Sequence, residues 1–276
     1  MENLKIKIDG DIVKKILGNT DTIKTYLGKM RVPYHNGLSA NDYRKLVVDT
    51  WQYDKSKDII RELFKSTTKY RNGKSADDAM QILLREWESL QLGDVSWPFS
   101  QGDFDGFVQR INSGDENGTT KDNAVKSAAV KYRRLKEINT VRNDYIETLI
   151  FNKNKNIIPT LSHRQGVDFY INGISFDQKV ARSPTKKFQK DYGAGWRDFA
   201  KRNPEIVAKY LYEGQDEGRF GKDPRLLVVY LDENIPIENI RGIIEQTDLD
   251  SPIEISFTYN HKIHGEKHYK VQCYVI

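Results

Sequence analysis

The order of secondary-structure patterns in this 276-residue chain predicts an α/β fold preceded by a mainly helical region. Apolar residues recur at helical spacing through much of residues 1–110. A long helical pattern, three short β-like segments, another helical region and one continuous apolar run follow between residues 123 and 232. This order of helix, three strands, helix and strand predicts a sheet flanked by helices.

The N-terminal region contains three segments whose apolar residues recur at helical spacing. The first begins with Ser39, a residue type that caps helix N-termini, and the third ends at Gly93, a residue type that follows helix C-termini. The three predicted helices are residues 39–51, 57–66 and 75–93.

The chain changes character near residue 120. Residues 95–107 break the helical rhythm, and residues 112–123 form a polar stretch rich in Gly, Asn and Asp, which predicts a loop. We place a boundary in this loop. It separates a mainly helical part, residues 1–120, from residues 121–276, which contain the predicted strands.

The second part begins with a helical stretch over residues 123–151 and continues with strands and further helices. Asn203 followed by Pro204 marks a helix N-terminus. The run at residues 225–232 is mostly apolar, as expected for a strand buried on both faces, and the last two strands are expected to form a hairpin. The predicted strands are residues 157–163, 167–171, 174–181, 225–232, 253–260 and 268–276.

The net charge of +5 is unevenly distributed along the chain. Residues 121–190 hold fifteen Lys or Arg and six Asp or Glu, a local charge of +9, so the rest of the chain sums to −4. A basic segment inside a slightly acidic chain suits a surface that faces a polyanion such as nucleic acid. A solvated lysine-rich surface is an equally good interpretation of the charge alone.

Composition also bears on the compartment. The single cysteine, Cys273, rules out an intramolecular disulfide framework and fits a reducing environment. The first residues lack the basic and apolar regions of a secretory signal, and no apolar run is long enough to cross a bilayer. We therefore expect a cytoplasmic protein with no membrane partner.

An Asn-Gly pair at residues 172 and 173 lies between alternating apolar residues and predicts a β-hairpin with a two-residue turn. Counting outward from this turn places Asp168 opposite Asp177, and Gly166 opposite Lys179. Because side chains alternate between the faces of a strand, both aspartates and Lys179 share one face. The core face receives Phe169, Ile171, Ile174 and Phe176.

Two directly opposed carboxylates have their Cβ atoms about 4.5–5.5 Å apart and repel each other. They need a shared proton, a neighbouring lysine or a bound cation. Mg²⁺ is a hard ion that takes one or two carboxylates and keeps several waters, and it activates water and phosphoryl groups. Lys179 on the same face can orient the water or stabilise charge on a phosphate. The pattern suits metal-assisted attack of water on a phosphoryl group, with a purely structural hairpin as the alternative.

Asp168, followed after a short turn by Asp177-Gln178-Lys179, resembles the PD-(D/E)xK motif of type II restriction endonucleases. The resemblance covers about residues 130–232 and departs from the motif at Val167, where the family often has proline. It implies a restriction-endonuclease-like core, a mixed central sheet flanked by helices.

The resemblance also implies roles for individual residues. Asp168 and Asp177 would bind Mg²⁺, the backbone carbonyl of Gln178 would complete the inner shell, and Lys179 would be catalytic. Members of the family often add a glutamate from the preceding helix, and Glu147 is the best-placed match. A solvated residue in a helical pattern is an equally good interpretation of Glu147.

The implied substrate is double-stranded DNA. Four basic residues beyond the site strand are predicted to contact phosphates, although an exposed basic loop also explains them. They are Arg182, Lys186, Lys187 and Lys190. Residues 1–120 and the C-terminal hairpin are then left to read bases and to form a homodimer, whose two-fold symmetry suits a palindrome. A restriction enzyme also implies a cognate DNA methyltransferase encoded nearby.

Two other functions stay open. A structure-specific or repair nuclease would use the same chemistry on junctions or damaged ends. A non-catalytic DNA-binding protein would bind DNA through the basic segment and cut nothing with any divalent ion.

Two further groups of residues have plainer interpretations. His261, His264 and His268 lie around the predicted tip of the last hairpin with no second ligand cluster, which favours a polar tip over structural zinc. Asp103 and Asp105 are interpreted as parts of an ordinary turn.

Overall fold

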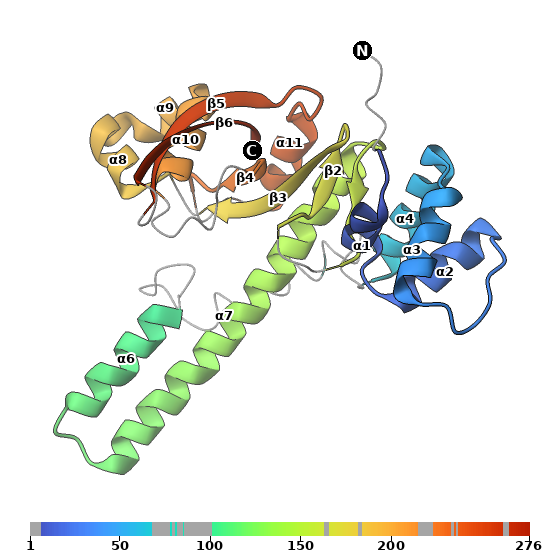
Figure 1. The fold of residues 1–276 in the computed structure, drawn as a ribbon. Helices are drawn as coiled ribbons and strands as arrows, with labels where there is room; N and C mark the ends of the chain where they lie inside the picture. Colours follow the sequence, from blue (N-terminus) through green and yellow to red (C-terminus); the bar gives the residue numbers. More distant parts are fainter. Residues whose placement is uncertain are drawn as a thin grey trace. The chain divides into compact units, whose positions relative to one another are not determined.

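The computed structural model describes residues 7–67, 78, 81, 85, 101–162, 166–181, 184–214, 223–232, 235, 237–261 and 265–276. Contacts divide the chain into two compact units, residues 1–68 together with 149–276, and residues 69–148. The described part is mainly helical and contains one open, six-stranded mixed sheet (Figure 1), which confirms the predicted α/β class.

The sheet belongs to the first unit and has the strand order β1-β2-β3-β4-β6-β5. Strands β1, β2 and β3 pair antiparallel, β4 lies parallel to both β3 and β6, and β5 and β6 form the predicted C-terminal hairpin. The strands are β1 (Ile158–Pro159), β2 (Phe169–Ile171), β3 (Ile174–Ala181), β4 (Arg225–Val229), β5 (Ile253–His261) and β6 (Gly265–Val275). As predicted, most of β4 is buried.

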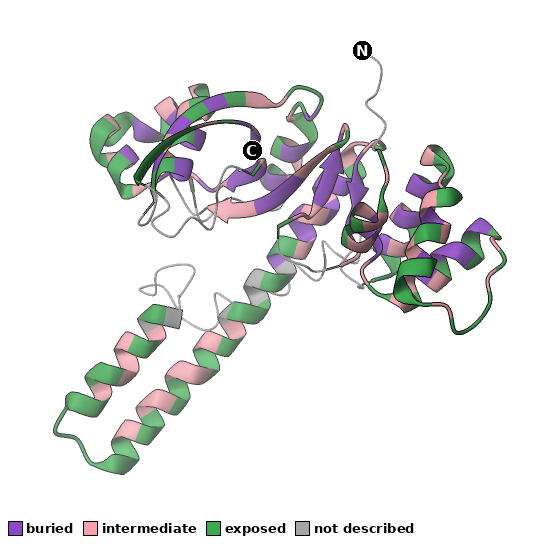
Figure 2. Cartoon of the chain, viewed as in Figure 1, coloured by how far each residue is buried: buried purple, intermediate pink, exposed green. Residues whose placement is uncertain are grey.

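Four helices precede the sheet among residues 7–67 of the same unit. They are α1 (Gly10–Leu17), α2 (Thr20–Met30), α3 (Ala40–Asp49) and α4 (Tyr53–Ser66). Ser39 and Asp42 form a capping box at the start of α3, as the predicted cap requires, and Asp9 and Asn19 cap α1 and α2. Their buried apolar side chains form one core with Ile158 of β1 and Tyr170 of β2 (Figure 2).

Further helices follow β3 in the chain, and α10 packs on β5 and β6. They are α8 (Lys186–Tyr192), the 3₁₀ turn η2 (Gly193–Gly195), α9 (Trp196–Arg202), α10 (Pro204–Glu213) and α11 (Ile237–Gln246). Pro204 occupies the first turn of α10 after Asn203, as predicted. Phe188 and Tyr212 from α8 and α10 pack in a second core with Leu227 of β4 and Phe257 of β5.

The second unit contains α6 (Gln101–Ser113) and most of α7 (Gly118–Lys153). The rings of Phe104 on α6 and Tyr132 on α7 stack with their centroids 5.3 Å apart. The predicted long helix is confirmed. The break predicted at residues 95–107 was wrong from residue 101, where α6 begins, and the loop predicted at residues 112–123 is shorter than predicted. Asn117 caps α7 by accepting a hydrogen bond from the backbone N–H of Thr120, so only residues 114–117 separate the helices.

Asp103 and Asp105 lie in α6, so the turn predicted for them was wrong. The predicted boundary between residues 120 and 121 falls inside α7, and the functions assigned to residues 1–120 and 121–276 stay predictions. Most of the predicted helix at residues 75–93 lies outside the described residues.

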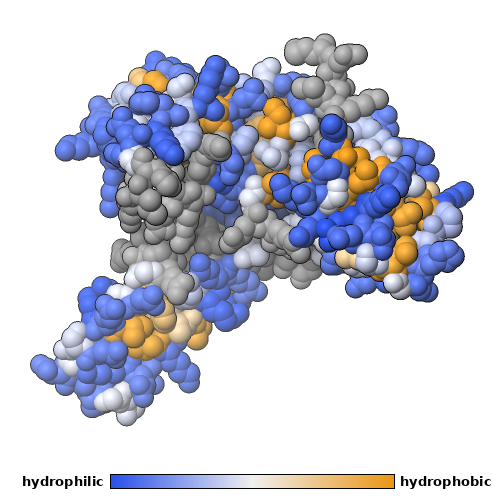
Figure 3. Space-filling view, viewed as in Figure 1, coloured by the Kyte–Doolittle hydropathy of each residue, from blue (hydrophilic) through white to orange (hydrophobic). Residues whose placement is uncertain are grey.

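None of the helices within the described residues combines the length and hydropathy of a bilayer-spanning segment. The face of the molecule in Figure 3 is largely hydrophilic, with apolar side chains gathered in small patches. This is the surface expected when most apolar side chains pack inside the two cores.

Candidate active site

The Asn-Gly turn forms as the sequence predicts. Asn172 and Gly173 have φ values of 51° and 83°, and a type I′ turn requires positive φ at both central residues. The register outward from the turn is also confirmed, because Ile171 pairs with Ile174 and Phe169 pairs with Phe176. The turn therefore brings Asp168 and Asp177 to the same end of the hairpin.

The two aspartates are not ladder partners, however. The N–H of Asp168 donates to the carbonyl of Phe176 at 2.8 Å, although Phe176 already pairs with Phe169. Two residues of one strand thus oppose one residue of the other, which is the pattern of a β-bulge. The N–H of Asp177 points to the opposite edge of β3 and donates to the carbonyl of Pro224, just before β4. The predicted direct opposition of Asp168 and Asp177 was wrong because the bulge shifts Asp168 out of register with β3. The predicted pairing of Gly166 with Lys179 is likewise absent from the described ladder.

At the bulge, the Asp168 carboxylate has a structural role. Beyond Phe176 the N–H of Gln178 has no β2 residue opposite it in the ladder. Oδ2 of Asp168 accepts a hydrogen bond from this N–H at 2.6 Å. A charge-assisted bond to a backbone N–H fixes the orientation of the carboxylate next to β3. Bulges often re-aim side chains in this way beside active sites.

Asp177 is buried and is held by two cations. Lys179 Nζ lies 2.9 Å from both carboxylate oxygens of Asp177. Arg225 Nη1 contacts Oδ2 of the same carboxylate. Arg225 is the partner of Asp177 in the parallel β3–β4 ladder, and its side chain is only 4% exposed. A buried carboxylate needs this kind of pairing, because an unpaired charge is very costly to desolvate.

The Asp168 carboxylate also affects the pKa of both cations. Burial lowers the pKa of Lys179, and the Asp168 carboxylate raises it in opposition. The pKa of the Arg225 guanidinium is lowered by burial and raised by Asp168 in the same way. Each cation therefore contacts Asp177 and lies within the field of Asp168. The two carboxylates converge on one pair of positive groups, which explains how the fold tolerates two acids from neighbouring strands.

The donor set suits a hard divalent cation, although it is small. Asp168 and Asp177 supply carboxylate oxygens, and the Gln178 carbonyl directly follows Asp177 on β3. Two carboxylates with water in the remaining positions are a typical Mg²⁺ site. No group of three or more His, Cys, Asp or Glu with metal-ligand geometry occurs among the described residues. An ion binding here would have to share Asp177 with Lys179 and Arg225.

The side chain of Gln178 points away from this chemistry, because it alternates with Asp177 and Lys179 along the strand. It is buried, as the sequence predicts for the core-facing side, and its Oε1 has no hydrogen-bond partner among the described residues. Only the backbone of Gln178 thus contributes to the site, through its N–H, which donates a hydrogen bond to the Asp168 carboxylate.

The remaining predicted residues are distributed differently. Glu147 is half-buried on α7 in the second unit, and its place beside the acidic pair stays a prediction. Arg182 lies outside the described residues. Lys186, Lys187 and Lys190 are all exposed on α8. Lys187 forms an ion pair of 2.5 Å with Asp191, a carboxylate that also accepts a hydrogen bond from Tyr210 at 2.8 Å.

The histidines do not gather into a ligand cluster in the described part. His261 and His268 lie on β5 and β6, where His261 pairs with Gly265 and His268 pairs with Thr258. The hydroxyl of Thr258 lies 2.9 Å from Nδ1 of His268. The tip between the strands is thus shorter than predicted, and His264 lies outside the described residues.

Sequence reasoning missed Arg225. The available signal was a charged residue at the start of the apolar run at residues 225–232. A cation at the edge of a buried strand needs an acidic partner, but the sequence alone does not identify that partner. The parallel β3–β4 pairing supplies it, because this pairing sets Arg225 beside Asp177.

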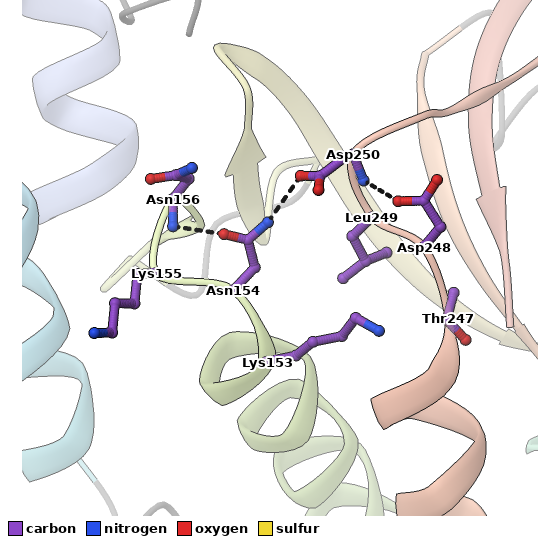
Figure 4. Close-up of a pocket in the computed structure, with 8 residues that line it drawn as sticks. All are labelled: Lys153, Asn154, Lys155, Asn156, Thr247, Asp248, Leu249 and Asp250. Carbon is purple, nitrogen blue, oxygen red and sulfur yellow. Dashed lines mark hydrogen bonds between the residues drawn. The ribbon is translucent and has the colours of Figure 1, made fainter.

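A polar hollow lies elsewhere in the first unit, between the end of α7 and the segment that follows α11 (Figure 4). Its polar groups satisfy one another: Asn154 donates to Asp250, Asn156 donates to Asn154, and Asp250 donates to Asp248. These bonds account for the hollow as a hydrogen-bonded junction, and we assign it no ligand.

Comparison with protein-family models, with curated proteins and with solved structures found no match. A function for this chain must therefore be argued from the site itself.

Proposed function

We propose that this protein is a Mg²⁺-dependent endonuclease that hydrolyses phosphodiester bonds in double-stranded DNA at a specific sequence, as type II restriction enzymes do. One observation carries the proposal: Asp168, Asp177 and Lys179 meet where β2 leaves β3, with Asp168 bonded to the Gln178 N–H and Asp177 bonded to Lys179. Two carboxylates can hold a divalent ion that activates water and a phosphoryl group, and an amine beside them can neutralise charge on the phosphate.

The chain's own residues then have distinct tasks. A bound Mg²⁺ would polarise a phosphoryl oxygen and acidify a coordinated water. Asp168 and Asp177 would hold the ion, and the hydrogen bond from Gln178 keeps Asp168 in place. Lys179, with its side chain 39% exposed, reaches solvent and can orient the attacking water or neutralise charge on the phosphate.

Two wider features support the proposal. The chain order of α7, three antiparallel strands, helices and a strand parallel to β3 matches the order expected for a restriction-endonuclease-like core. The basic segment at residues 121–190 and the exposed lysines of α8 suit a polyanionic substrate. A homodimer and a methyltransferase encoded nearby remain parts of the same proposal.

The test is digestion of intact plasmid DNA with Mg²⁺. The proposal expects discrete fragments from the unaltered protein and none from Asp168→Asn or Asp177→Asn. Asp191→Asn is the matched control, because it removes an aspartate that is paired with a lysine on α8, away from the site. Fragments without fixed ends would favour a structure-specific or repair nuclease. Absence of cutting with Mg²⁺, Mn²⁺ and Co²⁺ on plasmids of varied sequence would contradict catalysis.

One observation favours a second candidate, a non-catalytic DNA-binding protein. Asp177 is already neutralised by Lys179 and Arg225, so the cluster also works as a buried ion-pair network. In that case Asp177→Asn would lower the free energy of unfolding and leave DNA binding unchanged. A gel-shift assay beside the plasmid assay separates the two candidates.

A further inference from the structure

Arg225 occupies an unusual place for a charged residue. It opens β4, a central strand of the sheet, and pairs in the ladders with both Asp177 of β3 and Cys273 of β6. Only 3% of the residue is exposed. A guanidinium remains charged at this depth, so it must stay paired with an acidic group. Its contact with Oδ2 of Asp177 supplies that pairing.

The charges of the cluster balance without any added ion. Asp168 and Asp177 contribute two negative charges, and Lys179 and Arg225 contribute two positive charges. A divalent cation placed between the carboxylates therefore meets two positive groups, one of which contacts the oxygen that the ion needs. Lys179 can withdraw toward solvent because 39% of its side chain is exposed. Arg225, whose side chain is 4% exposed, has no such route.

The electrostatic repulsion between Arg225 and a divalent ion bound by the aspartates is large enough to measure. A unit charge within about 6 Å of a divalent ion, at the effective dielectric constant of about 20 found for protein sites, opposes binding by more than tenfold in affinity. The orientation of Asp177 does not depend on Arg225 alone, since Lys179 Nζ contacts both carboxylate oxygens. Removal of the Arg225 charge should therefore release the repulsion while Asp177 keeps its place.

We propose that Arg225 is a positioning residue that holds Asp177 in the metal-free site and sets a low affinity of the site for divalent cations in the absence of DNA. This inference rests on the proposed function, because it assumes that Asp168 and Asp177 bind the metal. A site of this kind fills when phosphates add negative charge beside it, so metal and DNA bind cooperatively.

The test measures Mn²⁺ binding to the full chain without DNA, by calorimetry and by the electron paramagnetic resonance signal of the free ion. Arg225→Gln removes the charge and keeps a hydrogen-bond donor. Arg225→Met is a second neutral variant with a side chain suited to a buried position. Arg225→Lys keeps the charge. Arg202→Gln controls for net charge, because Arg202 is exposed on α9 and its Nε donates to the backbone carbonyl of Asp198.

The expected result is Mn²⁺ binding at least about tenfold tighter in either neutral variant, with Arg225→Lys and Arg202→Gln within about threefold of the unaltered protein. The gain should disappear when Asp168→Asn is added. Unchanged or weaker binding in a folded neutral variant, with Asp168→Asn still abolishing binding, overturns the role of Arg225 and leaves the proposed function standing. Mn²⁺ binding that Asp168→Asn does not affect overturns both.

Discussion

At the scale of single residues, the site depends on how Asp177 is neutralised. Lys179 contacts both of its oxygens and Arg225 contacts one, so the carboxylate is fixed from two strands. The two cations differ in exposure, because the Lys179 side chain is 39% exposed and that of Arg225 is 4% exposed. Lys179 is therefore the cation that can meet a substrate, and Arg225 is the one that supports the fold of the site.

This difference predicts the effect of Lys179→Ala. Cleavage of plasmid DNA should fall by at least about 100-fold, the usual contribution of a positioned catalytic group. DNA binding in a gel shift should survive, because the α8 lysines remain exposed. Lys201→Ala is the matched control, since it removes an exposed lysine from α9 and leaves Asp177 paired. Cleavage at the original rate in Lys179→Ala would exclude this lysine from the mechanism.

Sequence reasoning reached Asp168, Asp177 and Lys179 because all three follow from one turn. The Asn-Gly pair sets the register, and the register sets the faces. The bulge and Arg225 were beyond its reach. Arg225 belongs to β4, which arrives from far along the chain and pairs with β3 on the edge opposite β2. The bulge depends on how β2 and β3 diverge beyond Phe176, which the turn does not determine. Pairing between distant strands is not encoded in any local pattern.

At the scale of elements, the turn between β2 and β3 determines whether the site assembles. Gly173 has a φ of 83°, where a Cβ atom is strained. We expect Gly173→Ala to lower the free energy of unfolding by about 1–2 kcal/mol in urea denaturation. Gly28→Ala is the control: Gly28 is an exposed residue of α2 with no atom near its Cβ position, so alanine there should stabilise by up to about 1 kcal/mol. Equal effects of the two variants would contradict the strain argument.

Strand β6 provides a prediction about pH. Burial raises the pKa of the Cys273 thiol from 9.0 to about 12. Between these values the folded chain binds more protons than the unfolded chain, so stability falls as the pH rises from about 9. In Cys273→Ala this contribution to the loss of stability at high pH is absent. The difference in free energy of unfolding between the unaltered protein and the variant should therefore shrink by about 1 kcal/mol from pH 8.5 to pH 10, measured by urea denaturation. A constant difference would show that the thiol does not titrate in this range.

At the scale of the whole chain, the pattern of elements was predictable and their grouping was not. Periodicity located α3, α7, β4 and the C-terminal hairpin because each has a strong local signal. The sequence boundary near residue 120 separated the N-terminal helices from the strands. The structure instead groups residues 1–68 with residues 149–276, because the core of α1–α4 includes Ile158 and Tyr170. Shared cores depend on tertiary contacts that hydropathy does not report.

Arg61 tests this grouping directly. From α4 its guanidinium donates to the carbonyls of Phe151, Asn154 and Ile157 at 3.0–3.1 Å, and it lies over the Phe151 ring at 3.9 Å. Loss of these bonds leaves three carbonyls near the end of α7 without their charged donor. We expect Arg61→Met to lower the free energy of unfolding by about 2–4 kcal/mol.

The unfolding of Arg61→Met should be measured with a probe in the sheet rather than in the N-terminal helices. Cys273 on β6 is buried, so its labelling by a thiol reagent in increasing urea reports when the sheet opens. If residues 1–68 and the strands form one cooperative unit, Arg61→Met will shift the labelling midpoint to lower urea.

The control is Lys65→Ala on the same helix, since Lys65 meets Phe151 only through a ring contact of 5.9 Å and should change stability by less than about 0.5 kcal/mol. An unshifted midpoint in Arg61→Met would mean that the N-terminal helices fold independently. The first 68 residues would then be available as a separate recognition module, whereas a shifted midpoint makes them part of the scaffold that holds Asp168 and Asp177.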